Sequence, residues 1–138
     1  MIAYLDASVV LRLVLGEPEP LKGWRKLDAV VASALTEVEC LRTLDRLTQM
    51  GLISADALPE RRITVYELLE SVEIIAVGPA VLRRAAQPFP TPLGTLDALH
   101  LATAMSWRDA RNEELTMATH DRALAAAARA SGFAVIGI

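Results

Sequence analysis

The chain has 138 residues, of which 53% are hydrophobic and 22% charged, and this composition predicts one compact domain over residues 1–138. Its formal net charge of −3 excludes a globally basic surface, so a nucleic-acid substrate would have to be held by local groups or metal ions. Charges interrupt every apolar run before membrane-spanning length, residues 1–5 lack the basic start of a signal peptide, and the single Cys40 permits no internal disulfide. We therefore expect a cytoplasmic protein without membrane association.

The predicted elements of the first half are two buried strands and four helices. Short apolar runs predict strands at 1–5 and 29–32. A first helix follows Asp6 and ends near Gly16, before the prolines at 18 and 20, and a second at 20–27 has Trp24 as its apolar anchor. Two longer helices, at 34–50 with Ser33 as N-cap and at 55–71, form a helical hairpin. This hairpin either covers the sheet or carries a dimer or partner surface, and both interpretations stay open.

The second half continues the alternation of strand and helix. Strands are expected at 72–77, 115–118 and 133–136, and helices at 79–86, 96–109 and 121–131. Three prolines and a glycine predict a loop at 87–94, and Thr95 is the expected N-cap of the helix that follows. Such alternation with nearly continuous apolar strands predicts an α/β fold, with three α/β/α layers around a mainly parallel sheet of four to five strands.

Acidic residues stand at the carboxyl ends of the predicted strands. Asp6 follows the first strand, Asp121 follows the fourth, and Asp97 lies in the first turn of the helix after the proline-rich loop. Glu37 and Glu39 lie in the opening turns of the helix after the second strand, and helical periodicity leaves open which of them points inward. Each acid alone is explicable as a helix cap or dipole partner. Because the carboxyl ends of parallel strands meet at one edge, we expect these carboxylates to share a site.

Several carboxylates in one cleft repel one another, so either their pKa values rise or a cation lies between them. Oxygen ligands without a cysteine cluster favour Mg²⁺ or Mn²⁺ over zinc, and such an ion activates water for phosphodiester cleavage. His100, three residues after Asp97, is predicted to be packed and hydrogen-bonded rather than a ligand, and His120 to be a surface residue. Ser8 and Thr119 either donate hydrogen bonds to ligand carboxylates or only cap helices.

Four stretches of the chain, in the same order, resemble the PIN-domain ribonucleases of the VapC toxin type: residues 4–8, 33–42, 96–104 and 119–122. The Leu-Asp-Ala-Leu-His-Leu-Ala run in the third stretch is the most specific. The resemblance implies a PIN-like fold, Mg²⁺- or Mn²⁺-dependent cleavage of RNA, inhibition by a VapB-type antitoxin, and homodimerisation. It also implies that Asp6, Glu39, Asp97 and Asp121 bind one or two metal ions, with Asp121 acting directly or through water. Gly94 departs from the family pattern, because many relatives carry an arginine there.

Two other enzyme classes place an aspartate at the end of a first strand. A phosphatase of the haloacid-dehalogenase kind needs a second aspartate where Ser8 stands, and a receiver domain needs a late lysine, whereas no lysine follows Lys26. The alternative to a nuclease is therefore a PIN-like module that binds RNA or a protein without cleavage, and loss of an acid would indicate it. The sequence names neither the RNA nor the antitoxin.

Overall fold

The computed structural model describes residues 1–17, 21 and 23–138. The prolines at 18 and 20 and the start of the helix predicted at 20–27 lie outside these residues. In the described part of that segment, the helix is a single 3-10 turn, η1 (Trp24–Lys26). Trp24 packs against the core as a partly buried side chain, so the predicted anchor is present although the predicted α-helix is not.

The centre of the molecule is a parallel sheet, and the five strands of the described chain lie in the order β3-β2-β1-β4-β5. Their bounds are β1 (Ile2–Leu5), β2 (Ala29–Ser33), β3 (Glu73–Ile75), β4 (Thr116–Ala118) and β5 (Ala134–Ile136). At the carboxyl end of β1, Leu5 lies beside Ala32 of β2 and Ala118 of β4. Strand β3 is shorter than the predicted 72–77, because its pairing with β2 ends at Ile75.

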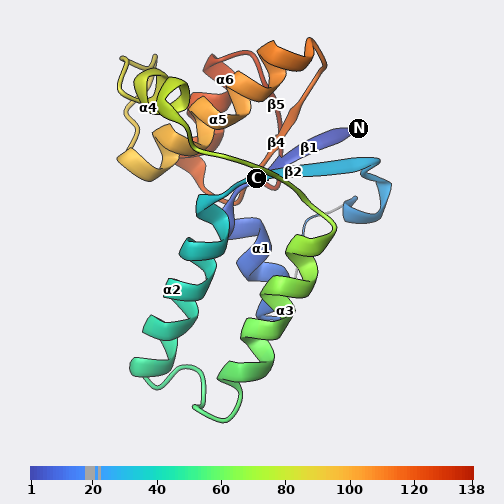
Figure 1. Cartoon of the computed structure of the whole chain (residues 1–138), viewed down its shortest axis with the longest axis vertical. Coiled ribbons are helices and arrows are strands. Elements are labelled where there is room, and N and C mark those ends of the chain that lie inside the picture. The colour runs from blue at the N-terminus through green and yellow to red at the C-terminus, as the bar shows by residue number, and fades with distance from the viewer. Residues whose placement is uncertain (18–20, 22) are drawn as a thin grey trace.

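Helices cover both faces of this sheet (Figure 1). One face carries α1 (Ala7–Val14), α2 (Leu35–Gln49) and α3 (Leu58–Glu70), and the other carries α4 (Pro79–Ala85), α5 (Thr95–Arg111) and α6 (Arg122–Ala130). Successive side chains of a strand point to opposite faces. Accordingly, Ala3 and Leu5 of β1 join the core beneath α1 to α3, whereas Tyr4 joins the core beneath α5 and α6. The predicted three-layer α/β/α fold is confirmed.

Strand order reverses at β1. The chain passes from β1 to β2 and β3 on one side, and later returns to the other side for β4 and β5. Open parallel sheets form their binding crevice at such a reversal, outside the carboxyl ends of the strands. Asp6 follows β1 at this point, and its backbone N–H donates a hydrogen bond of 3.2 Å to the carbonyl oxygen of Ala118. The fold therefore brings the first predicted site residue to the crevice.

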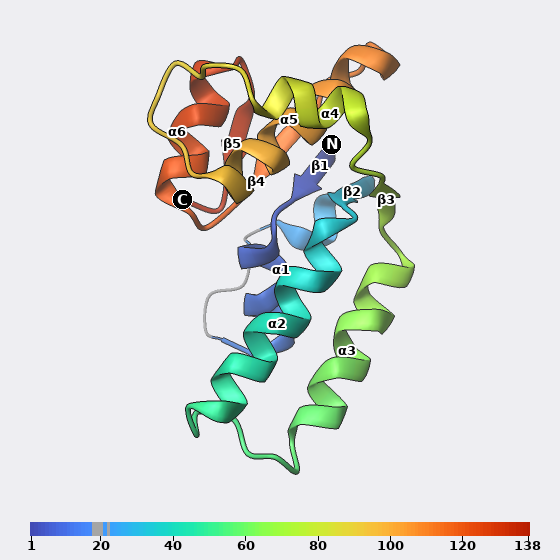
Figure 2. The same cartoon turned by 60° about the vertical axis from the view of Figure 1, so that its left-hand side comes forward.

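Helices α2 and α3 lie side by side as a hairpin that extends away from the sheet (Figure 2). Both contact α1, so the hairpin closes one part of the core. It also leaves large apolar side chains exposed, namely Val38, Met50, Leu52, Ile63 and Tyr66. The hairpin thus has the two properties that the sequence left as alternatives, a buried side and an apolar outer surface. Within the described chain, no helix has the length and apolarity needed to cross a membrane.

Two predicted helix caps are wrong by one residue. Ser33 pairs with Ile75 and is the last residue of β2, so Ala34 is the N-cap of α2, although the Ser33 hydroxyl still accepts a hydrogen bond from the Leu35 N–H at 3.1 Å. Thr95 is already helical, and Gly94 caps α5 with an extended backbone. These shifts are small because the cap is set by where the preceding strand or loop stops, which residue preference alone does not fix.

Candidate functional site

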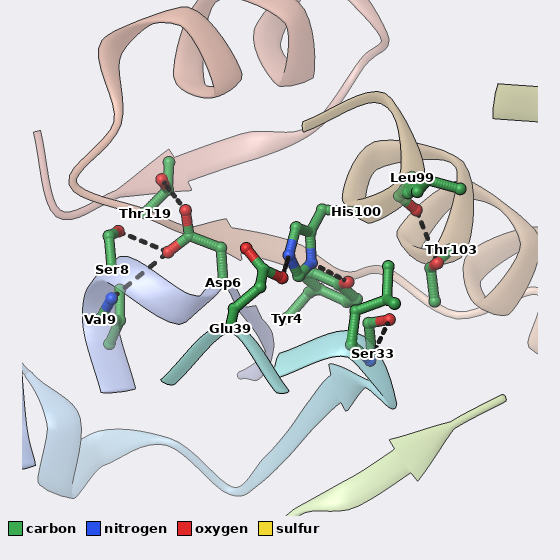
Figure 3. A network of polar contacts seen from close by, with 11 residues as sticks. Tyr4, Asp6, Ser8, Val9, Ser33, Glu39, Leu99, His100, Thr103 and Thr119 are labelled. Carbon is green, nitrogen blue, oxygen red and sulfur yellow. Dashed lines mark hydrogen bonds and ion pairs between the residues drawn. The ribbon is translucent and has the colours of Figure 1, made fainter. Parts of the chain in front are cut away.

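Asp6 is a buried carboxylate at the reversal point of the sheet, with 4% of its surface exposed. It accepts hydrogen bonds from the hydroxyls of Ser8 at 2.5 Å and Thr119 at 2.7 Å, and from the Val9 N–H at 3.3 Å (Figure 3). The contact with Val9 makes Asp6 the N-cap of α1. The capping and the site interpretations of Asp6 are therefore compatible, because one carboxylate oxygen caps the helix while the other accepts a hydrogen bond from Thr119, which follows β4.

The hydroxyls of Ser8 and Thr119 join two strand–helix junctions. Each donates to a different oxygen of Asp6, and each also accepts a backbone hydrogen bond from the β4–α6 junction. The N–H of His120 donates to Ser8 Oγ at 2.9 Å, and the N–H of Asp121 donates to Thr119 Oγ1 at 2.9 Å. These two donors, which the sequence suggested only as candidates, fix the relative positions of β1, α1 and β4.

Asp97 lies in the first turn of α5, within the electrostatic field of the other predicted acids. Burial, followed by the negative charges of Asp121, Asp6 and Glu39, raises the pKa of Asp97 to about 6. Burial also raises the pKa of Asp6, and the hydrogen bonds from Ser8 and Thr119 partly offset that effect. The negative charges of the neighbouring carboxylates thus add to the effect of burial in disfavouring the ionised form of Asp97.

Glu39 reaches the site from α2. Its Oε1 lies 2.5 Å from Nε2 of His100, which α5 contributes one turn after Asp97. The His100 ring is buried, with 2% of its side chain exposed, whereas 21% of the Glu39 side chain is exposed. The structure therefore places Glu39 in contact with the helix that carries Asp97, a contact that periodicity along α2 could not assign. The neighbouring Cys40 faces the core, and burial raises the pKa of its thiol to about 12.

Asp121 is the most exposed of the four acids and caps α6, accepting a hydrogen bond from the Leu124 N–H at 2.8 Å. The prediction that His120 is a surface residue is wrong. Its ring is partly buried, and Nδ1 donates to the carbonyl oxygen of Gly137 at 2.7 Å. That contact is tertiary, since it joins the β4–α6 junction to the chain after β5. The sequence around position 120 contains no signal for it.

The four acids are neighbours, but their side chains are not arranged as a metal coordination shell. Within residues 1–17, 21 and 23–138, no three His, Cys, Asp or Glu side chains are arranged to hold a metal ion. Both oxygens of Asp6 accept hydroxyl hydrogen bonds, and Glu39 contacts His100. The donor chemistry nevertheless fits Mg²⁺ or Mn²⁺, because hard carboxylate oxygens predominate and a cation would relieve the repulsion that raises the pKa of Asp97.

Sequence reasoning did not assign Tyr4 to the site. Tyr4 lies at the third position of β1, and its hydroxyl contacts Nδ1 of His100 at 2.7 Å. A usable signal was present, because a tyrosine in a fully buried strand needs a partner for its hydroxyl. Gly94, where many relatives carry an arginine, caps α5, and a side-chain carbon added there would meet no atom within 4 Å.

A family model for the PIN domain matches residues 3–130. The chain belongs to the PIN domain family. This PIN domain is 36% identical over 140 residues to "Ribonuclease VapC35" of Mycobacterium tuberculosis, with 96% of this chain and 94% of the relative covered. It is 32% identical over 136 residues to "Ribonuclease VapC46" of the same organism, with coverage of 96% and 95%. The resemblance seen in the four sequence stretches is confirmed.

The fold of this PIN domain is also that of solved toxin–antitoxin structures. The structure of VapBC2 from Rickettsia felis, bound to a DNA fragment from the promoter, superposes with a TM-score of 0.68 at 14% identity, covering 98% of this chain and 97% of that one. A toxin–antitoxin complex from Klebsiella pneumoniae gives a TM-score of 0.65 at 19% identity, covering 89% and 90%. At such identities the comparison concerns the fold.

Proposed function

We propose that this PIN domain is a Mg²⁺- or Mn²⁺-dependent endoribonuclease of the VapC type, acting as the toxin of a toxin–antitoxin pair in the cytoplasm. The observation that carries the proposal is the contact geometry of the acids: Thr119 Oγ1 donates to Asp6 and accepts from the Asp121 N–H, and Glu39 contacts His100, three residues after Asp97 on α5. Burial, followed by the charges of Asp121, Asp6 and Glu39, also raises the pKa of Asp97. The relatives named as VapC ribonucleases, aligned over almost the whole chain, support the same activity.

In this proposal Asp6, Glu39 and Asp97 hold the cation directly, and Asp121 binds it directly or through water. When bound, the ion supplies a water molecule of lowered pKa and neutralises charge on the phosphodiester. Ser8 and Thr119 hold Asp6 in place throughout, because each donates to one of its oxygens. Asp6 is fixed by its hydroxyl donors, Glu39 is held at one oxygen by His100, and Asp121 is the most exposed of the four acids.

The proposal is tested with protein dialysed against EDTA and then incubated with structured RNA, with and without Mg²⁺ or Mn²⁺. We expect cleavage only with the metal, and loss of cleavage in Asp97→Asn. Asp109→Asn is the matched control, because Asp109 lies on the same helix, is exposed, and pairs with Arg84 instead of the site. Cleavage in EDTA, or full activity of Asp97→Asn, would contradict a metal-dependent nuclease. RNA binding without cleavage under all conditions would instead support the non-catalytic module.

We further propose a VapB-type antitoxin partner and a homodimer. The solved neighbours VapBC2 and the Klebsiella pneumoniae complex are toxin–antitoxin assemblies, and the α2–α3 hairpin and the start of α5 expose apolar side chains such as Val38, Ile63 and Leu96. Co-expression with the product of an adjacent reading frame should give a complex that no longer cleaves RNA. Light scattering on the toxin alone should give twice the chain mass, and a monomer across micromolar concentrations would contradict the dimer.

A further inference from the structure

A hydrogen-bonded chain of three side chains links the interior of the sheet to Glu39. Tyr4 of β1 contacts Nδ1 of His100 at 2.7 Å, and Nε2 of the same ring contacts Oε1 of Glu39 at 2.5 Å. Tyr4 is fully buried and His100 is 2% exposed. The two rings also meet edge to face, with centroids 5.9 Å apart and planes at 74°. This hydrogen-bonded chain therefore begins at the packed side chain of Tyr4 and ends at the partly exposed carboxylate of Glu39.

The chemistry of the two ends fixes the direction of the chain. A tyrosine hydroxyl ordinarily carries its proton at neutral pH, so Tyr4 can donate to Nδ1 at 2.7 Å. A carboxylate only accepts, so the Glu39 contact requires a proton on Nε2. The Nε2–H form of the neutral imidazole satisfies both contacts at once. The opposite tautomer would direct a lone pair at Glu39 and an N–H at the tyrosine.

The contact with His100 engages one oxygen of Glu39 and leaves the other available. In Figure 3 this second oxygen points toward the side on which Asp6 lies. A free glutamate side chain samples several rotamers, and ordering it costs conformational entropy. The contact with His100 restricts the Glu39 side chain before any ligand binds, because the His100 ring is itself held by burial and by Tyr4.

We propose that Tyr4 and His100 are positioning residues that hold Glu39 in the orientation from which its free oxygen binds the divalent cation. The metal-binding part of this inference rests on the proposed metal-dependent function, whereas its geometry rests on the contacts among Tyr4, His100 and Glu39. Partners that orient a metal-ligating carboxylate commonly change metal affinity by about 10–100-fold when they are removed. A histidine that only fills space would leave metal affinity unchanged in every variant that folds.

The test uses calorimetric titration of Mn²⁺ into the full-length protein, with thermal unfolding as the measure of folding. His100→Leu should weaken Mn²⁺ binding by about 10–100-fold. His100→Gln should restore most of the affinity, because its amide nitrogen can donate to Glu39 from about the place of Nε2. Tyr4→Phe should weaken binding less than His100→Leu does, since the ring stays in place but loses the donor that selects its tautomer. Trp107→Phe, a buried change on the same helix and remote from Glu39, should bind Mn²⁺ like the wild type.

Nitrogen NMR of the metal-free protein reports which nitrogen of the His100 ring carries the proton, without metal or RNA. His100 should carry its proton on Nε2 in the wild type, and Tyr4→Phe should populate the other tautomer. A proton on Nδ1 in the wild type would overturn the direction of the chain. Equal Mn²⁺ affinity for folded His100→Leu and wild type would overturn the positioning role. If the wild type binds no Mn²⁺, both the metal-dependent function and the positioning of Glu39 for the ion are contradicted. The tautomer of His100 is measured independently of that result.

Discussion

Asp97 lies among like charges, and neutralising it should therefore stabilise the protein in the absence of metal. Burial and the charges of Asp121, Asp6 and Glu39 disfavour its ionised form. Asn has nearly the same shape and carries no charge. The substitution Asp97→Asn should consequently raise the free energy of unfolding of the metal-free protein while it removes metal binding and cleavage, the trade-off expected where function requires a strained site.

The magnitude follows from the pKa of Asp97. The difference between about 6 and the ordinary value of 3.8 corresponds, at about 1.36 kcal/mol per unit, to about 3 kcal/mol for a carboxylate shielded from water. Asp97 is only partly buried, so solvent screening reduces the expected gain to about 1 kcal/mol. Its favourable position at the start of α5 works in the opposite direction and reduces the expected gain further.

Urea unfolding in the presence of EDTA, at neutral and at mildly acidic pH, measures this gain. The folded protein keeps a proton on Asp97 up to a higher pH than the unfolded chain does. The carboxylate therefore destabilises the fold progressively as pH rises from about 4 to about 6, so the gain of Asp97→Asn should be complete at about pH 7.5 and absent near pH 4.

Asp109 provides a control of opposite sign on the same helix. A hydrogen bond from Arg84 holds the pKa of Asp109 below its usual range, so this carboxylate contributes stability above its unfolded pKa and loses it as pH falls. Asp109→Asn should then be neutral or slightly destabilising at neutral pH, because the pair is exposed. An unchanged or lower stability of Asp97→Asn at neutral pH, or a gain that is equal at both pH values, would refute the explanation by charge repulsion.

Three further outcomes are expected. Gly137→Ala should lower the free energy of unfolding by about 1–3 kcal/mol, because φ is +102° at this residue and the new Cβ would clash with the carbonyl oxygen of Thr119. Urea unfolding measures this loss, and Gly78→Ala, where the new Cβ would meet open space, is the control. Thr119→Val should cost about 1–3 kcal/mol, since buried Asp6 loses a donor, and should move the acid limb of the cleavage profile to higher pH. Mn²⁺ at 100 times its Kd should stabilise the wild type by about 2.7 kcal/mol in thermal unfolding, but not Asp6→Asn, and EDTA should reverse it. Stabilisation of Asp6→Asn equal to that of the wild type would remove Asp6 from the ligand set.

Local patterns along the chain determined the order of the elements and the fold class. Short apolar runs such as residues 1–5 are typical of buried strands, and helical periodicity with glycine and proline boundaries marks the helices between them. Alternation of the two then restricts the architecture to a parallel sheet covered on both faces. Asp6 and Asp121 could be picked out because each stands at a strand–helix junction, and Asp97 because it lies in the first turn of the helix after the proline-rich loop.

Tertiary structure alone decided how those carboxylates are held. Periodicity along α2 could not choose between Glu37 and Glu39, because the choice depends on where His100 of α5 lies, sixty-one positions further along the chain. The partners of Tyr4 and His120 were equally hidden, since each contacts a residue from another element. Sequence patterns report which residues are buried, whereas hydrogen-bond partners across the sheet depend on strand order. The reversal at β1 is what places Asp6 beside Thr119, which follows β4.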